Sequence, residues 1–263
     1  MLVDLFLFMG QSNMAGRGIS NIEHPETAPS LIPGAGYEYR AVSSPDALHV
    51  LSEPFGRDEN RFDGIDDGGL KTGSMVTAFV NAYFKMTGTT IIGVSASKGG
   101  SCISQWQPGG PLLTDAIGRL KAANEYLVAN GYTVRHRYML WCQGESDGDI
   151  GKTHEAYRSD FENMLDEMRS NGIETCFLVQ IGHYNGSERV DYTDIMNAQT
   201  EISRTNANVV MVSTSFADMK ERGLMKDAFH YVQQAYNEVG TEAGIQTALH
   251  VNRLENRMKN GRL

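Results

Sequence analysis

The sequence has little cysteine and no long apolar run. Its three cysteines, Cys102, Cys142 and Cys176, are an odd number in a chain of 263 residues, which argues against a disulfide framework. No apolar segment approaches the roughly 20 residues needed to cross a bilayer. The apolar start, Met1–Met9, contains Asp4 and lacks both a basic leader and a small-residue cleavage site, so it does not resemble a signal peptide. We therefore expect a soluble, cytoplasmic protein with free thiols and no membrane partner.

Positive charge is also scarce. Lys and Arg total 23 against 32 Asp and Glu, so the formal net charge is −9. A negative surface repels nucleic acid and polyanionic substrates, and we expect neither as a partner. The charge does not argue against a neutral sugar or an ester. Apolar residues at 41% and charged residues at 21% are ordinary for a globular protein and argue against disorder.

Five short segments are apolar at nearly every residue, the pattern of strands that are covered on both faces of a parallel sheet. They are Leu2–Met9, Ile91–Ser97, Arg137–Cys142, Thr175–Ile181 and Asn208–Ser215. Helical patterns occupy Ser74–Met86, Leu113–Asn130, Lys152–Asn171, Val190–Asn206 and Tyr231–Leu254. This alternation predicts a single three-layer α/β/α domain over residues 1–263, with a five-stranded, parallel, doubly wound (flavodoxin-like) sheet.

The segment 19–71 does not fit the alternation. It holds five of the seven prolines and ends in the Gly/Asp-rich run Asp63–Gly69. Because proline removes a backbone donor, we expect neither a continuous helix nor a central strand here. Loops this long in compact domains are usually functional or disordered. The segment starts just after the first strand and its turn, so we interpret it as a structured insertion that walls the active site, as a lid or as a static wall.

Polar residues follow the predicted strands at the edge where a doubly wound sheet binds ligands. These segments are 10–16, 98–101, 143–147 and 182–185, and residues 227–230 precede the last helix. They supply hydroxyl, glycine amide, carboxamide, imidazole and carboxylate groups. Acyl transfer needs these groups as a nucleophile, a base, a partner that orients the base, and oxyanion donors. The sequence therefore favours acyl-transfer chemistry.

Ser12 lies between two glycines, just after a buried strand, where a helix N-cap is also expected. As a nucleophile it needs an adjacent base, because a serine hydroxyl is weak on its own. Of the seven histidines, only His183 and His230 are expected at the carboxyl edge of the sheet. Asp227 precedes His230 by three residues and could orient its ring or merely cap the last helix. We interpret Ser12, His230 and Asp227 as a catalytic triad and His183 as a substrate contact.

Four motifs carry a resemblance to a known superfamily. GQSNM at 10–14, KGGS at 98–101, WCQGESD at 141–147 and DAFH at 227–230 resemble the SGNH/GDSL hydrolases, and within them the branch of sialate O-acetylesterases and acetylxylan esterases. The resemblance implies an oxyanion hole made by the backbone N–H groups of Ser12 and Gly100 and the side chain of Gln143. The broader superfamily usually has asparagine where Gln143 stands. Gly99 is the nearest alternative to Gly100, and Gln143 could instead cap a neighbouring loop.

Five further residues are candidates for substrate binding, namely Gln11, Arg17, Gln105, Trp106 and Glu145. Trp106 could stack on a sugar face or belong to the core. Arg17 is close enough to the nucleophile to bind the carboxylate of a sialic acid. Glu145 is expected to be structural, or to assist the catalytic histidine as a second acid.

Together these features predict a serine esterase that removes O-acetyl groups from carbohydrates, of xylan or mannan type or sialic acids, through an acetyl-enzyme. The sugar follows from the resemblance alone. The sequence has no P-loop, dinucleotide or HExxH motif and no metal-ligand spacing, so we expect no cofactor and no metal. Two alternatives remain: a lipid or acyl-thioester hydrolase on the same scaffold, and a non-catalytic carbohydrate-binding module. The sequence indicates no oligomeric state.

Overall fold

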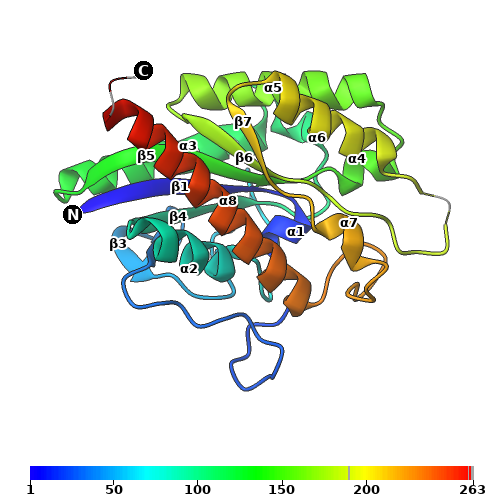
Figure 1. The fold of residues 1–263 in the computed structure, drawn as a ribbon, viewed down its shortest axis with the longest axis horizontal. Coiled ribbons are helices and arrows are strands. Elements are labelled where there is room, and N and C mark those ends of the chain that lie inside the picture. The colour runs from blue at the N-terminus through cyan, green and yellow to red at the C-terminus, as the bar shows by residue number, and fades with distance from the viewer. Residues whose placement is uncertain (189, 260, 262–263) are drawn as a thin grey trace.

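The computed structural model describes residues 1–188, 190–259 and 261, which form a three-layer arrangement around one sheet (Figure 1). The strand order is β3-β2-β4-β1-β5-β6-β7. All neighbouring strands in this order are parallel, except that β3 at the edge is antiparallel to β2. Their bounds are β1 Leu2–Gly10, β2 Gly36–Arg40, β3 Ser44–Val50, β4 Thr90–Ser97, β5 Thr133–Cys142, β6 Thr175–Val179 and β7 Val209–Ser213.

Helices cover both faces of the sheet. α2 (Val76–Thr87) and α8 (Gln233–Lys259) pack together on one face, and α3 (Pro111–Ala129), α5 (His154–Ser170) and α6 (Thr193–Thr205) lie on the other. Short helical turns follow strand ends, namely α1 (Ser12–Ala15), η1 (Ile103–Trp106), α4 (Glu145–Asp149) and α7 (Phe216–Met219). In the described part of the chain, no helix is both long and apolar enough to cross a membrane.

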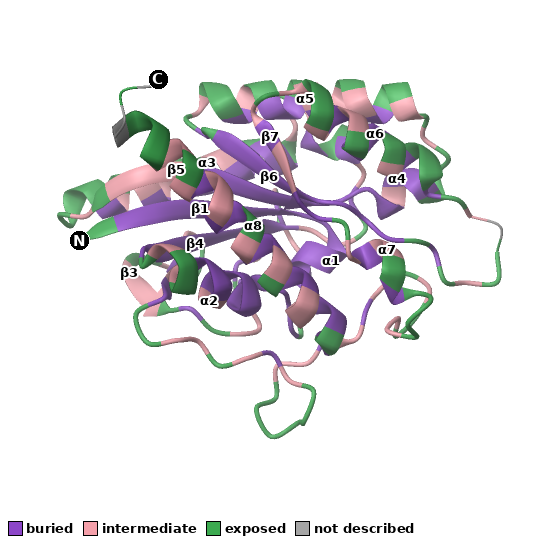
Figure 2. Ribbon diagram, viewed as in Figure 1, coloured by how far each residue is buried: buried purple, intermediate pink, exposed green. Residues whose placement is uncertain are grey.

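The two cores explain why the strands are apolar on every residue. Along β1, Leu5 and Leu7 pack into the core under α3, α5 and α6, while Phe6 and Phe8 pack into the core under α2 and α8. Successive side chains of a strand point to opposite faces, so burial of both faces requires apolar residues without alternation. Figure 2 shows the central strands buried along most of their length.

The predicted fold class is confirmed, with one correction to the strand count. All five predicted strands and five predicted helices are present, and Gly131 and Gly172 follow α3 and α5 with φ of +75° and +100°. The sheet has seven strands rather than five because the insertion supplies β2 and β3.

The expectation that segment 19–71 contains no central strand was wrong. β2 lies between β3 and β4 and pairs with both. Its residues, Gly36–Arg40, fall between Pro33 and Pro45 and include no proline, so every backbone donor is available to the ladder. Pro45 lies in β3 at the edge of the sheet, the position where a missing N–H is tolerated.

The far end of the insertion is tied to the sheet through a buried lysine. The Nζ atom of Lys71 donates to the carbonyl of Gly56 at 3.1 Å and to Oγ of Ser95 on β4 at 2.9 Å. Burial lowers the pKa of Lys71 to about 8. A buried amine requires such acceptors, so these bonds fix the end of the insertion beside the carboxyl edge of β4.

Candidate active site

The candidate site is built at the end of β1, where the chain order of the sheet reverses between β4 and β5. Gly10 has a φ of +141°, and a Cβ there would overlap the carbonyl of Cys142 on β5. This close approach lets the N–H of Gln11 donate to the Cys142 carbonyl at 3.0 Å. The turn starts α1 with Ser12 as its first residue, and Gln11 occupies the N-cap. The alternative role of Ser12 as an N-cap is therefore not what the structure shows.

Ser12, His230 and Asp227 form a continuous hydrogen-bonded chain. Oγ of Ser12 lies 3.0 Å from Nε2 of His230, and Nδ1 of the same ring lies 2.9 Å and 3.1 Å from the two carboxylate oxygens of Asp227. In the tautomer with hydrogen on Nδ1, Nε2 accepts the serine proton. These distances and this order of contacts are those of a nucleophile, a base and a group that orients the base.

Asp227 is held by its own turn. One carboxylate oxygen accepts the backbone N–H groups of Phe229 at 2.8 Å and His230 at 2.7 Å. Burial acts to raise the pKa of Asp227, but these two bonds and the His230 ring outweigh it, so the pKa lies below its usual value. The carboxylate stays ionised and can stabilise an imidazolium. The last helix begins only at Gln233, so Asp227 is not its N-cap.

Two backbone N–H groups beside Ser12 are free for an oxyanion. Neither Ser12 N nor Gly100 N donates to any described residue, and both residues line the same pocket. Gly100 adopts a φ of +68°, and a Cβ there would meet open space. The N–H of Gly99 instead donates to Asp67 at 2.7 Å. Of the two glycines, Gly100 is therefore the available donor.

The structure does not bring the Gln143 side chain into the pocket. Gln143 is completely buried, and its Nε2 donates to the Ser101 carbonyl at 2.9 Å and to the Asp147 carboxylate at 2.5 Å. Its Oε1 accepts from the Tyr157 hydroxyl at 3.2 Å. Both amide hydrogens are thus in use. The expectation of a third oxyanion donor is corrected in favour of the alternative, a side chain that fixes the neighbouring Gly99–Ser101 turn.

A second, buried hydrogen-bond network centred on Asn13 contacts the loop that carries His230. The sequence alone did not indicate Asn13 or Tyr236 as part of the site. Nδ2 of Asn13 donates to Glu145 at 2.5 Å and to the carbonyl of Phe229 at 3.1 Å, and Oδ1 accepts from the Tyr236 hydroxyl at 2.7 Å. The GQSNM motif contains Asn13, but nothing in its spacing shows that it would contact residues 132 and 216 positions away.

Glu145 is the titratable group of this network. Its side chain lies beside the pocket but is only 3% exposed, and burial raises its pKa to about 7 despite the Asn13 hydrogen bond. Its Oε2 has no partner among the described residues. Glu145 makes no hydrogen bond to His230 in the described structure. It acts on the His230 loop through Asn13, so the prediction of a structural role fits the geometry better than that of a second acid.

The pocket above the triad has a volume of about 310 Å³. It is lined by Gln11, Ser12, Arg17, Leu70, Gly99, Gly100, Glu145, Ser146, Asp149, Phe229 and His230. Leu70 belongs to the insertion, so the insertion forms part of the wall. Phe229 is 38% exposed, and it is the aromatic ring that the pocket offers to a ligand.

Arg17 and Gln11 lie in the pocket but are already engaged. The Arg17 guanidinium contacts both oxygens of Asp67, at 3.0 Å and 2.9 Å. Oε1 of Gln11 accepts the N–H groups of Gly144 at 3.1 Å and Ser146 at 3.3 Å. These bonds join the turn after β1 to the insertion and to the turn after β5. Both side chains therefore help to position the site walls.

The remaining three candidates are outside the pocket. Trp106 is completely buried, donates its ring N–H to Ser101 at 3.0 Å and packs edge-on against Trp141, so it belongs to the core. Gln105 accepts the N–H of Cys102 at 3.0 Å in the cap of η1. His183 is exposed and lines a separate hollow. The structure therefore places neither Gln105 nor Trp106 in the lining of the pocket above the triad, so it does not support the prediction that they contact substrate.

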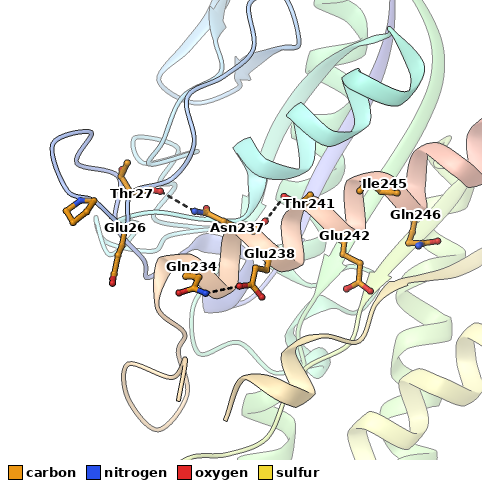
Figure 3. Close-up of a pocket in the computed structure, with 10 residues that line it drawn as sticks. Glu26, Thr27, Gln234, Asn237, Glu238, Thr241, Glu242, Ile245 and Gln246 are labelled. Atoms are coloured by element: carbon orange, nitrogen blue, oxygen red, sulfur yellow. Dashed lines mark hydrogen bonds between the residues drawn. The ribbon is translucent and has the colours of Figure 1, made fainter. Parts of the chain in front are cut away.

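A larger hollow of about 660 Å³ lies along α8 and does not contain the triad (Figure 3). There the Asn237 side chain donates to the Thr27 carbonyl at 3.1 Å, and Gln234 donates to Glu238 at 2.9 Å. Its lining lacks a serine or cysteine next to a histidine, so size alone does not locate the chemistry. Among residues 1–188, 190–259 and 261, no three His, Cys, Asp or Glu side chains are grouped to hold a metal ion.

Known proteins resemble this chain in sequence and in fold. A probable carbohydrate esterase of Arabidopsis thaliana is 25% identical over 253 residues, which cover 90% of this chain and 86% of the relative. The X-ray structure of an Arabidopsis thaliana protein superposes with a TM-score of 0.70 at 24% identity, covering 94% of this chain and 98% of that one. A carbohydrate acetylesterase from Xanthomonas citri gives a TM-score of 0.59 at 16% identity, over 94% of this chain and 57% of its own. Both structural matches show a shared fold.

The family itself is identified by sequence. The sequence model described as carbohydrate esterase, sialic acid-specific acetylesterase, matches residues 2–247, which is nearly the whole chain. The resemblance carried by the GQSNM and QGESD motifs is thereby confirmed. The chain belongs to this carbohydrate esterase family and is a carboxylic ester hydrolase.

Proposed function

We propose that the protein removes O-acetyl groups from carbohydrates through an acetyl-serine intermediate on Ser12. The observation that carries the proposal is the chain of contacts from Ser12 Oγ through His230 to Asp227, at 3.0 Å and 2.9 Å, inside a pocket with two free N–H groups. A non-catalytic binding module would have no need for this arrangement.

The reaction proceeds in two halves. Ser12 Oγ attacks the acetyl carbonyl carbon while Nε2 of His230 takes its proton, and Asp227 stabilises the resulting imidazolium. The N–H groups of Ser12 and Gly100 receive the charge on the carbonyl oxygen. His230 then donates its proton to the departing sugar oxygen. In the second half, water attacks the acetyl-enzyme with His230 as base, and acetate leaves as Ser12 recovers its proton.

The charges in the pocket favour a neutral sugar over a sialic acid. Arg17 is the cation of the lining, and both oxygens of Asp67 already occupy its guanidinium. Glu145 and Asp149 also line the pocket. The carboxylate of a sialic acid would have to displace Asp67 to reach the bidentate site on Arg17. Xylan- or mannan-type units carry no such group.

The acetate released from a panel of substrates tests the proposal. We expect turnover of acetylated xylo- and manno-oligosaccharides, weaker turnover of O-acetylated sialic acid, and none by Ser12→Ala. On p-nitrophenyl esters the rate should fall steeply from acetate to octanoate, because a pocket of about 310 Å³ has little room for a long acyl chain beside the leaving group. A preference for octanoate would support the lipid-hydrolase alternative instead.

A further inference from the structure

A second hollow adjoins the catalytic pocket on the far side of Phe229. It has a volume of about 520 Å³, and its lining includes His183, Tyr184, Asn185, Tyr192, Lys220 and Glu221. It lies between the loop that follows β6 and the residues just after α7. None of these residues takes part in the catalytic chain described above.

Two residue pairs form the wall that the catalytic pocket shares with this hollow. The ring of Phe229, which lines the catalytic pocket, lies 5.4 Å from the ring of Tyr184, which lines the hollow. Asp149, on the catalytic side, accepts the hydroxyl of Tyr192, on the other side, at 2.7 Å. The two hollows are thus neighbours across one layer of side chains, in which the Phe229 ring is 38% exposed.

The backbone holds the two loops of this wall together. The N–H of Asn185 donates to the carbonyl of Ala228, two residues before His230, at 3.0 Å. Nζ of Lys220 donates to the carbonyl of Tyr184 at 2.7 Å. The hollow is thus attached to the loop that carries the catalytic base, and its position relative to Ser12 is fixed by the same contacts.

The chemistry of the lining selects the kind of ligand. An imidazole, a carboxamide and carboxylates lie beside tyrosine rings, so the walls offer many hydrogen-bonding groups next to apolar ring faces. An acyl chain would leave those groups unpaired. An anion would meet Asp191 and Glu221, while the lysine of the lining is engaged with a carbonyl. A neutral polyhydroxylated ring can pair with these hydrogen-bonding groups and carries no charge for the carboxylates to repel.

We propose that this hollow is a second saccharide subsite, so that the enzyme binds an oligosaccharide with its acetylated unit over Ser12 and the neighbouring unit in the hollow beyond Phe229. The inference rests on the proposed function and extends it, since it states that the preferred substrate has at least two sugar units. The apolar face of the acetylated unit packs on the exposed Phe229 ring. Hydroxyl groups of the neighbouring unit meet His183 and Glu221.

The test compares kcat/KM on mono- and oligosaccharides that carry the same acetyl group. The probes are acetylated xylose and xylotriose, and the matching mannose pair. We expect the wild-type ratio of kcat/KM on the trisaccharide to kcat/KM on the monosaccharide to be about ten, which is the effect of one or two well-placed polar contacts. His183→Ala and Glu221→Ala, both exposed residues that should fold normally, should reduce this ratio mainly through KM. His24→Ala, an exposed histidine in the insertion, should leave it unchanged.

The outcomes separate the subsite from the proposed function. Equal kcat/KM on mono- and trisaccharides of both series, or an unchanged ratio in both variants, would overturn the subsite while leaving sugar deacetylation intact. Cleavage of p-nitrophenyl acetate without acetate release from any acetylated sugar would overturn the proposed function, and the subsite with it.

Discussion

Replacing Glu145 with glutamine should change how stability depends on pH. Burial raises the pKa of Glu145 from 4.5 to about 7, so between these values the folded chain holds a proton that the unfolded chain has lost. The free energy of unfolding contributed by this group therefore falls as pH rises from about 4.5 to about 7. At 1.36 kcal/mol per pH unit the loss is about 3 kcal/mol. Glu145→Gln cannot ionise, and its Oε1 can still accept from Asn13.

Urea unfolding of both proteins at several pH values between 4.5 and 8 measures the effect. As pH rises across this range, the free energy of unfolding of Glu145→Gln should increase by about 3 kcal/mol relative to that of wild type. This change does not depend on the pH-independent cost of the substitution. Taking the difference between the proteins cancels the other titrating groups, apart from small changes at the nearby Asp147 and Asp149. Glu155→Gln, at an exposed position on α5, is the matched control and should show a nearly constant difference. A constant difference in Glu145→Gln as well would refute the reasoning.

Four other predictions follow from the site. Ser12→Ala and His230→Ala should each remove nearly all esterase activity, and the double variant should be hardly worse, because triad members act as a unit; additive losses in kcat would contradict this. Asp227→Asn should keep the fold by circular dichroism and lower kcat by up to about 10⁴ through the wrong histidine tautomer. Gln143→Ala should lower both kcat and the free energy of unfolding, the latter by about 1–3 kcal/mol, because buried acceptors lose their donor; loss of kcat at full stability would instead identify Gln143 as an oxyanion donor. Incubation with EDTA should leave acetate release unchanged, and activity lost to EDTA and restored by zinc or calcium would argue against the serine mechanism.

The sequence by itself determined the layers and the edge where the chemistry lies. Continuous apolar segments such as 2–9 and 91–97 are incompatible with a sheet that has one wet face, because each residue must be buried on one side or the other. Parallel strands then bring their carboxyl ends to one edge, which placed Ser12 and His230 together although 218 positions separate them. The proximity of Asp227 to His230 also followed from local spacing, since a turn of three residues closes that contact.

Tertiary structure alone decided which polar groups face the pocket. A glutamine after a strand has two donors in any sequence, but the Ser101 carbonyl and Asp147 take both donors of Gln143. Arg17 is similarly engaged by Asp67, from an insertion whose path depends on long-range contacts. Trp106 is buried rather than exposed because the turn before it directs the ring toward Trp141. Hydrogen-bond partners and side-chain direction depend on distant residues, so local patterns do not encode them.

The same reason explains the two extra strands and the pocket's aromatic wall. Prolines mark where a backbone donor is missing, but whether the proline-free stretch 36–40 pairs depends on the free edge of β4 being available to it. The local sequence indicates only that Phe229 is an apolar residue in a turn. It lines the pocket because Asn13 holds its carbonyl and the ring of Tyr184 packs against its own.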